Sequence, residues 1–541
     1  MCTAAPAQTG AAPQSGLRTL AVWNQLPPPP LMRGIGDATL KITTRSPAAQ
    51  SYFNQGLRLL HCFWYFEAYR AFREAARLDP SAPMAYWGIA ESLSNFPAMQ
   101  DEAAVAIQKA ESLMNLASDH ERYYIRAAAD LTETPGNAGR DGYVREMQAL
   151  IEKYPGDLNA PAFLAFFVMS GYEPDGRPTP GEVYAQTLLR RILRLDPGNV
   201  AANHYWIHAV EDGPAPQEGL KSVQLLLRVA PNSGHLVHMA GHIYFRLGDY
   251  EKARQYFLQS MRVDERYMAR EHIPPDDDAD YEHNLSYLVA ACAEAGRYRE
   301  ALRWAEKLDK LAASPAWGAS ALNYEIPVGS TLMRLHLRFA DWQAAAHDPI
   351  DFGVDPAEFN PPARDYQNAW HAYARGMAAL ERDPTKLSLE QARAEAGRLL
   401  DMMRGLSVYA SRETGPASFW TGGAVHLLDV ASTELDGNLK AAQGEETEGF
   451  RLLTAATQKE RDLGYTEPPY YARPVEETLG DVYLKAHDWS LARQVFGQEL
   501  RIRPQSGFAL FGIARSYGLE GRTGAAIRAY EAFLDAWTNA D

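Results

Sequence analysis

The stretch 51–81, SYFNQGLRLLHCFWYFEAYRAFREAARLDPS, decides the fold of this chain. It carries small residues such as Gly56 and Ala68, where two helices can cross, with aromatic residues between them. It closes at Pro80, and proline cannot continue a helix. We therefore expect two antiparallel helices joined by a short turn, a helix hairpin that buries its aromatic side chains between the two helices.

The same landmarks recur along the chain. Closing prolines stand at residues 80, 197, 231 and 504, and the step from Pro197 to Pro231 is 34 residues. The turn Gly248–Ala253 (GDYEKA) has a close match in Gly296–Ala301 (GRYREA). Another copy of the repeat begins at Leu479. Hairpins in such an array bury their apolar faces against their neighbours, so the chain is expected to form one continuous solenoid.

These landmarks resemble the tetratricopeptide repeat. The resemblance implies an all-α fold, a right-handed superhelix of antiparallel helix pairs. On this basis we expect four parts: an extended N-terminal arm over 1–46, a repeat array over 47–310, degenerate helical repeats over 311–470, and a C-terminal repeat pair over 471–541.

Composition excludes several classes of protein. The net charge is −15, from 68 acidic and 53 basic residues, and no basic run marks a nucleic-acid track. The three cysteines, at positions 2, 62 and 292, form no CxxC pair, which excludes a cysteine-based zinc site. No run of 18 apolar residues predicts a transmembrane helix. No GxSxG, phosphate-binding loop or dinucleotide fingerprint is present.

The start of the chain leaves the cellular location open. Met1-Cys2 is followed by a run rich in Ala, Gln, Gly, Pro and Ser, which is similar to the start of a mature lipoprotein. The alternative is a cytoplasmic chain with a flexible start.

Histidines concentrate in one part of the repeat array. Seven of the 14 histidines fall between positions 204 and 283. His204 and His208 are followed 34 residues later by His238 and His242, so the two pairs occupy matching places in consecutive repeats. The other three in this range are His235, one helical turn before His238, His272 in an insertion, and His283, which opens the next repeat. In the tetratricopeptide family the matching positions of the first helix face the concave groove, so the resemblance implies that six of the seven, all but His272, line one groove wall.

Pairs of histidines at i and i+4 suggest a metal site. Such imidazoles lie one above the other on a helix, with Cβ atoms about 6 Å apart, and can coordinate one ion together. Neutral imidazole suits copper, iron and zinc. We therefore predict that a transition metal is held by His204, His208, His235, His238, His242 and His283, with its identity open.

Two carboxylates are candidates for general acid–base chemistry near these histidines. Glu211 falls at position 12 of the His204 helix and Glu91 near position 9 of an earlier repeat, both in the register that the family turns toward the groove. Either carboxylate could serve as a base for zinc-type hydrolysis of a small molecule. Glu211 is more often a salt-bridge partner than a base at such a position.

Three functions remain open at this point. Six histidines dividing three and three would suit a copper pair that handles dioxygen, and one copper or iron ion would also support redox chemistry. We favour an oxidoreductase over a hydrolase, since the His-Glu-x-x-His motif of metalloproteases is missing from the sequence. The alternative is a non-catalytic scaffold that binds a peptide or partner protein in the groove.

Longer segments resemble a bacterial subgroup of repeat proteins. They are Asn203–Glu211 (NHYWIHAVE), Gly234–Met239 (GHLVHM), Glu282–Asn284 (EHN), Met84–Gly88 (MAYWG) and Glu467–Tyr470 (EPPY). The resemblance implies a shared histidine site without naming a reaction. An insertion over Tyr267–Tyr281, some 14 residues beyond the usual repeat (48 − 34), carries several aspartates and is expected to be a surface excursion, a lid or a source of further carboxylates.

Overall fold

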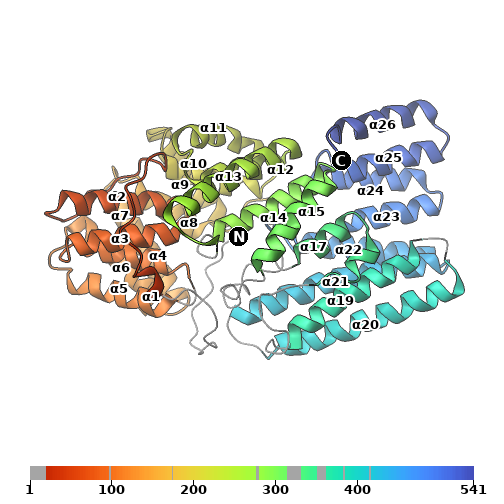
Figure 1. Ribbon diagram of the computed structural model, residues 1–541, viewed down its shortest axis with the longest axis horizontal. Coiled ribbons are helices and arrows are strands. Elements are labelled where there is room, and N and C mark those ends of the chain that lie inside the picture. The colour runs from red at the N-terminus through yellow and green to blue at the C-terminus, as the bar shows by residue number, and fades with distance from the viewer. Residues whose placement is uncertain are drawn as a thin grey trace. The chain divides into compact units, whose positions relative to one another are not determined.

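The computed structural model describes residues 20–96, 99–173, 175–275, 279–312, 330–349, 361–381, 384–412 and 416–541. Its elements are α-helices, short turns and one 3-10 helix, and no strand occurs in these ranges (Figure 1). The described chain divides into two compact units. Unit 1 comprises residues 18–243 and 256–281, and unit 2 comprises residues 244–255 and 282–541, each as far as it is described. This division rests on compactness, whereas the four parts expected from the sequence rest on repeat motifs.

Unit 1 is built from helices that pair with their neighbours in the chain. They are α1 (Leu20–Trp23), α2 (Pro47–Leu60), α3 (Tyr65–Leu78), α4 (Pro83–Leu93), α5 (Gln100–Ser112), α6 (Asp119–Glu133), α7 (Asn137–Lys153), α8 (Asn159–Val168), α9 (Pro180–Leu195), α10 (Val200–Glu211), η2 (Pro216–Gly219), α11 (Leu220–Val229), most of α12 (Gly234–Arg246) and the later part of α13 (Tyr250–Glu271). The pairs α2 with α3, α4 with α5, α6 with α7 and α8 with α9 pack closely.

Unit 2 repeats this pattern with several longer helices. It holds most of α14 (Ala279–Glu294), then α15 (Tyr298–Ala312), α17 (Thr331–Arg338), α18 (Trp342–Ala345), α19 (Pro361–Leu380), α20 (Lys386–Ala410), α21 (Pro416–Ala442), α22 (Glu446–Asp462), α23 (Val475–Lys485), α24 (Trp489–Ile502), α25 (Gly507–Leu519) and α26 (Thr523–Ala536). Stacked helix pairs in both units confirm the predicted all-α solenoid of tetratricopeptide type.

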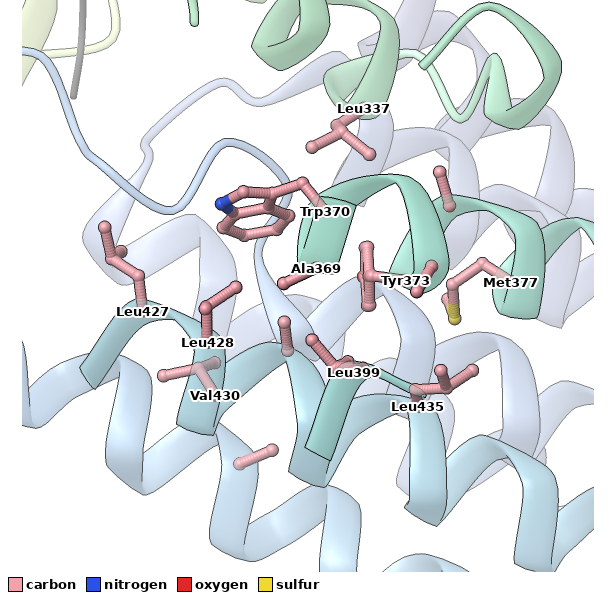
Figure 2. Packing of buried hydrophobic residues seen from close by; sticks show 14 of the residues in the cluster. Leu337, Ala369, Trp370, Tyr373, Met377, Leu399, Leu427, Leu428, Val430 and Leu435 are labelled. Carbon is pink, nitrogen blue, oxygen red and sulfur yellow. The ribbon is translucent and has the colours of Figure 1, made fainter. Parts of the chain in front are cut away.

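The core of unit 2 lies between its long helices. Figure 2 shows Trp370 and Tyr373 of α19 packed above Leu399 of α20 and Leu428 and Leu435 of α21. Each of these side chains is buried. Their burial explains why this stretch folds although its repeat landmarks are weak in the sequence, because apolar periodicity alone is enough to pack helices.

The residues before α2 are held by hydrogen bonds to α2 within unit 1. Residues 27–46 contain no helix, as a proline-rich stretch favours. The Gln55 side chain on α2 accepts from the backbone of Met32 at 2.7 Å and donates to the Pro30 carbonyl at 3.0 Å. Arg58 donates to the Ala38 carbonyl at 3.1 Å.

Cys2 lies outside the described residues. Among the described residues, none of the helices combines the length and apolar character needed to cross a membrane.

Glycines set the spacing between neighbouring helices at the aromatic positions. Phe496 of α24 is buried between Gly480 and Gly512, and a Cβ on Gly512 would lie 2.5 Å from the Phe496 ring. In the same way Phe72 of α3 lies against both Gly56 and Gly88. Each ring therefore occupies the space that two glycines leave free, one on the helix before it and one on the helix after it.

This packing predicts that Gly512→Ala destabilises the protein, although alanine favours a helix. The new methyl group would overpack the Phe496 ring, which costs about 1–3 kcal/mol. The matched control is Gly497→Ala on α24, where a Cβ meets nothing within 4 Å, so a gain of up to about 1 kcal/mol from helix propensity is expected. Urea unfolding of both variants measures the difference. Equal changes in the two variants would contradict this account of the packing.

Candidate metal centre

Two neighbouring helices of unit 1 carry the histidines. Asn199 caps α10, and its side chain accepts from the Ala202 amide at 2.9 Å. This start places His204 and His208 one turn apart on one face of α10, and Glu211 one turn further. The N-terminus of α12 is fixed by Ser233, whose hydroxyl accepts from the Leu236 amide at 3.3 Å. The caps therefore set the register of both helices.

Three imidazoles converge through their Nε2 atoms. His204 Nε2 lies 3.1 Å from His208 Nε2 and 3.0 Å from His235 Nε2. Nitrogen atoms of all three side chains lie within 4.8 Å of one another. Two nitrogens that share one tetrahedral ion at the usual bond length are about 3.3 Å apart. The observed separations therefore match those of histidines that share a metal ion.

The hydrogen bonds made by the Nδ1 atoms show that the Nε2 atoms are the ring nitrogens that face one another. His204 Nδ1 lies 2.6 Å from the His61 carbonyl oxygen, and His208 Nδ1 lies 2.7 Å from Glu211 Oε1. Both partners only accept hydrogen bonds, so both Nδ1 atoms carry a proton and donate it. In a neutral imidazole the lone pair is then on Nε2, directed at the other rings. Burial, together with His208 and His235, lowers the pKa of His204 well below its ordinary value, so this ring is neutral.

Glu211 links the two helices. Its Oε1 accepts from His208 on the same helix, and its Oε2 accepts from His242 Nδ1 on α12 at 2.9 Å. Burial raises the pKa of this carboxyl, but His242 and His208 outweigh burial and hold the pKa well below its ordinary value. A carboxylate behind a histidine fixes the orientation and the tautomer of the ring, as in carboxylate–histidine–metal arrangements.

A second pair of imidazoles lies next along α12. His242 Nε2 is 2.5 Å from His238 Nε2. Because His242 donates from Nδ1 to Glu211, a neutral His242 presents its Nε2 lone pair to His238. His238 and His242 are 2% and 1% exposed, and His204 is fully buried. The sequence predicted an open groove wall, whereas in the structure these three rings are buried.

The turn between α2 and α3 covers the histidine triad, which the sequence did not reveal. The Phe63 ring lies 4.5 Å from the ring of His204, 5.1 Å from that of His235 and 5.4 Å from that of His208, between centroids. Phe63 has a φ of 58°, a left-handed conformation that costs a non-glycine residue energy and persists where the surroundings enforce it. The sequence predicted that Phe63, like the other aromatic residues of this hairpin, packs between the two helices. In the structure its left-handed backbone distinguishes Phe63 from those residues.

The side chain of His61 positions its own carbonyl. His61 Nε2 lies 3.2 Å from Asn159 Oδ1, and Nδ1 lies 3.0 Å from the Tyr205 hydroxyl. The amide oxygen accepts, so His61 donates from Nε2 and the Tyr205 hydroxyl donates to Nδ1. Burial lowers the pKa of His61 to about 4, which keeps the ring neutral. His61 is thereby held in place while its carbonyl accepts from His204.

The insertion after α13 contributes a carboxylate. Asp280 Oδ1 lies 3.3 Å from His235 Nδ1. One carboxylate of the insertion, that of Asp280, therefore lies close to the histidine triad. The aspartates at 276–278 lie outside the described residues.

The remaining predicted site residues lie on other helices. His283 belongs to unit 2, on α14, where its Nε2 is 3.7 Å from Glu467 Oε2. Glu91 belongs to unit 1, on α4, where its carboxyl interacts with the Trp87 side chain and with the hydroxyl groups of Tyr143 and Tyr205. Within unit 1 the structure therefore brings together five of the six predicted histidines with Glu211.

Three comparisons place the chain among known proteins. Residues 235–267, which begin at His235, match the model of the family described as Tetratricopeptide repeat. No curated protein matches the chain. Similar solved structures include the human IFIT1 dimer with m7Gppp-AAAA, at 11% identity, covering 90% of this chain and 94% of that chain with a TM-score of 0.36.

Two further structures are similar at the same level. The Cut9–Hcn1 hetero-tetramer of APC/C is 13% identical, covering 91% of this chain and 74% of that chain with a TM-score of 0.35. Yeast Tom70 is 10% identical, covering 88% of this chain and 90% of that chain with a TM-score of 0.30. At these TM-scores the likeness carries no inference about ligand or activity. The chain therefore carries a tetratricopeptide repeat at residues 235–267, within an array of stacked helix hairpins of the same type.

Proposed function

We propose that this protein is a metal-dependent enzyme whose transition metal ion is held by His204, His208 and His235. The convergence of the three Nε2 atoms supports the proposal, with separations of 3.0 and 3.1 Å from His204 to its two neighbours. Imidazole nitrogens whose lone pairs face one another at this distance repel each other unless a proton or a cation lies between them. A site built in this way is suited to a cation.

The surrounding residues prepare the three rings for an ion. The His61 carbonyl and the Glu211 carboxylate hold Nδ1 protons outward, so that Nε2 is the ligating atom of His204 and His208. Phe63 covers the rings with an apolar face, which excludes water and strengthens electrostatic interactions at the site. The ligand set of imidazoles favours copper, iron or zinc over magnesium or calcium.

Redox chemistry fits the site better than hydrolysis. When bound, copper or iron would supply electron transfer to a small molecule or dioxygen, whereas zinc would activate water. The sequence suggested Glu211 as the base for hydrolysis, but both of its oxygens already accept hydrogen bonds from His208 and His242. Glu211 therefore acts as a positioning residue in this proposal, and oxidation of a small molecule is the favoured reaction.

The first expected outcome concerns metal content. Protein purified without a histidine tag should retain about one or two equivalents of copper, iron or zinc by elemental analysis, and His208→Ala should lose the ion at this site because one of three ligands is removed. The matched control is His347→Ala, which changes an exposed histidine of unit 2 and should leave the metal content intact. A metal-free wild type that also fails to take up added metal would overturn the proposal and favour a non-catalytic scaffold that binds a peptide or partner protein.

Dioxygen uptake separates the two chemistries. Copper- or iron-loaded protein with ascorbate should consume dioxygen faster than His208→Ala carrying the same total metal. Retention of zinc alone, with hydrolysis of a model ester and no dioxygen uptake, would replace the redox version with the hydrolytic one.

A second expected outcome concerns Glu211. Glu211→Gln keeps the size of the side chain but removes the charge that orients two rings, so metal affinity should fall about 10- to 100-fold. Competition with a coloured chelator measures this affinity. Glu218→Gln, on η2 of the same unit, is the control and should bind metal like the wild type. An unchanged affinity in Glu211→Gln would show that the carboxylate does not position the ligands.

Glu91 is the second carboxyl that the sequence suggested as a base. Burial raises its pKa to about 7, only partly opposed by a hydrogen bond with the Trp87 side chain. A group with this pKa gives and takes protons readily at neutral pH. Glu91 also interacts with the Tyr205 hydroxyl, which lies 3.0 Å from Nδ1 of His61 beside the histidine triad, so Glu91 replaces Glu211 as the candidate proton carrier of the proposed reaction.

The raised pKa of Glu91 predicts a pH-dependent stability. The folded protein keeps the Glu91 proton up to pH about 7, while the unfolded chain releases it near 4.5, so stability is greatest at low pH in this window and falls as pH rises. Between pH 5 and 8 the wild type should lose roughly 2 kcal/mol more than Glu91→Gln, allowing for partial exposure of the side chain. Urea unfolding at the two pH values tests this, with the exposed Glu152→Gln as control. If the stability of the wild type and of Glu91→Gln changed with pH in parallel, this would refute the raised pKa on which the role of Glu91 depends.

A further inference from the structure

A small cavity in unit 2 is separate from the histidine site. Its volume is about 50 Å³, and it is lined by α14, α17, the segment before α23 and the C-terminal end of α24, with Phe245 beside them. Three arginines, Arg334, Arg338 and Arg503, and one glutamate, Glu294, contribute its charged groups. The lining therefore carries an excess of positive charge.

The single carboxylate of the lining is shared by two arginines. Arg338 donates to Glu294 through Nε at 2.7 Å and Nη2 at 3.1 Å, and Arg503 Nη1 donates to the same carboxylate at 3.0 Å. Arg338 also donates through Nη1 to Glu477 at 2.5 Å. Behind them, burial and the charge of Glu477 raise the pKa of Glu499 well above its ordinary value.

Arg334 is the arginine placed to meet a ligand. It lies one turn before Arg338 on α17, so both guanidinium groups project from the same face of the helix. Arg334 Nη2 donates to the Pro469 carbonyl. Burial lowers the pKa of Arg334 to about 10, and the charge of Arg503 acts in the same direction. An anion in the cavity would offset both effects.

The size and the walls of the cavity select the class of anion. A volume of about 50 Å³ accommodates about three or four water-sized groups. The walls beside the arginines are apolar and include Val289, Ala293 and Leu335. A planar carboxylate matches the fork of a guanidinium, and a short alkyl chain matches the walls, whereas the further oxygens of phosphate would face apolar side chains.

We propose that this cavity binds the carboxylate of a small aliphatic acid, with Arg334 and Arg503 as its partners and the alkyl chain against Val289 and Leu335. This site is independent of the metal proposal, because its residues all belong to unit 2.

Sodium propionate is the probe for this cavity. In thermal unfolding and titration calorimetry of the full chain, propionate should stabilise the protein in a saturable manner beyond sodium chloride at the same ionic strength. Propionamide has the same shape without the charge and should not stabilise it. Arg334→Met should weaken propionate binding at least 10-fold, whereas the control Arg515→Met, which changes a more exposed arginine paired with Asp481, should bind like the wild type.

A second variant keeps the test decisive if Arg334→Met does not fold. Ala290→Leu adds a side chain to the cavity wall and should abolish the propionate response while all charged groups remain. The proposal is overturned if propionate acts no differently from chloride, if phosphate stabilises the protein and propionate does not, or if both cavity variants respond like the wild type.

Discussion

The close approach of glycine to an aromatic ring is the contact on which the solenoid depends. In α12 and α13 a Cβ on Gly241 would collide with the Phe257 ring, so only glycine lets the two helices approach this far. The same Phe257 ring lies 5.0 Å from the ring of His238 and 6.1 Å from that of His242. The contact that sets the helix spacing therefore also forms a wall for two imidazoles.

Glu211 gives the histidine cluster its internal order. The carboxylate accepts from one ring on its own helix and from one on the next, so two consecutive repeats share a single charge. Because Glu211 and His242 are buried, their interaction stabilises the charge more than it would at a surface. The fixed tautomers of His208 and His242 follow from this one residue.

Sequence periodicity predicted the fold and the proximity of most of the histidines, because both depend on local spacing. The closing prolines and the small residues of stretches such as 51–81 predicted the hairpins, and the 34-residue interval between His204 and His238 predicted that neighbouring helices present imidazoles together. What the sequence could not predict depends on distant contacts. The rings of Phe63 and His204 are in contact although the two residues are 141 positions apart in the sequence (204 − 63), and no local sequence pattern predicts that contact. Burial of the rings and the arginine cavity of unit 2 likewise arise from packing among several helices.

The histidine triad also brings two consecutive repeats of unit 1 together with a turn that is distant in the chain. Its rings come from α10 and α12, and the turn after α2 covers them. In an array where each hairpin touches mainly its neighbours, the ends can fray separately. An ion shared by His204 and His235 would act as a cross-link that closes a loop of about thirty residues, much as a disulfide does. Loss of the ion would then loosen the array locally and expose the α10–α12 segment to proteases first, so metal supply would govern the lifetime of the protein as well as its chemistry.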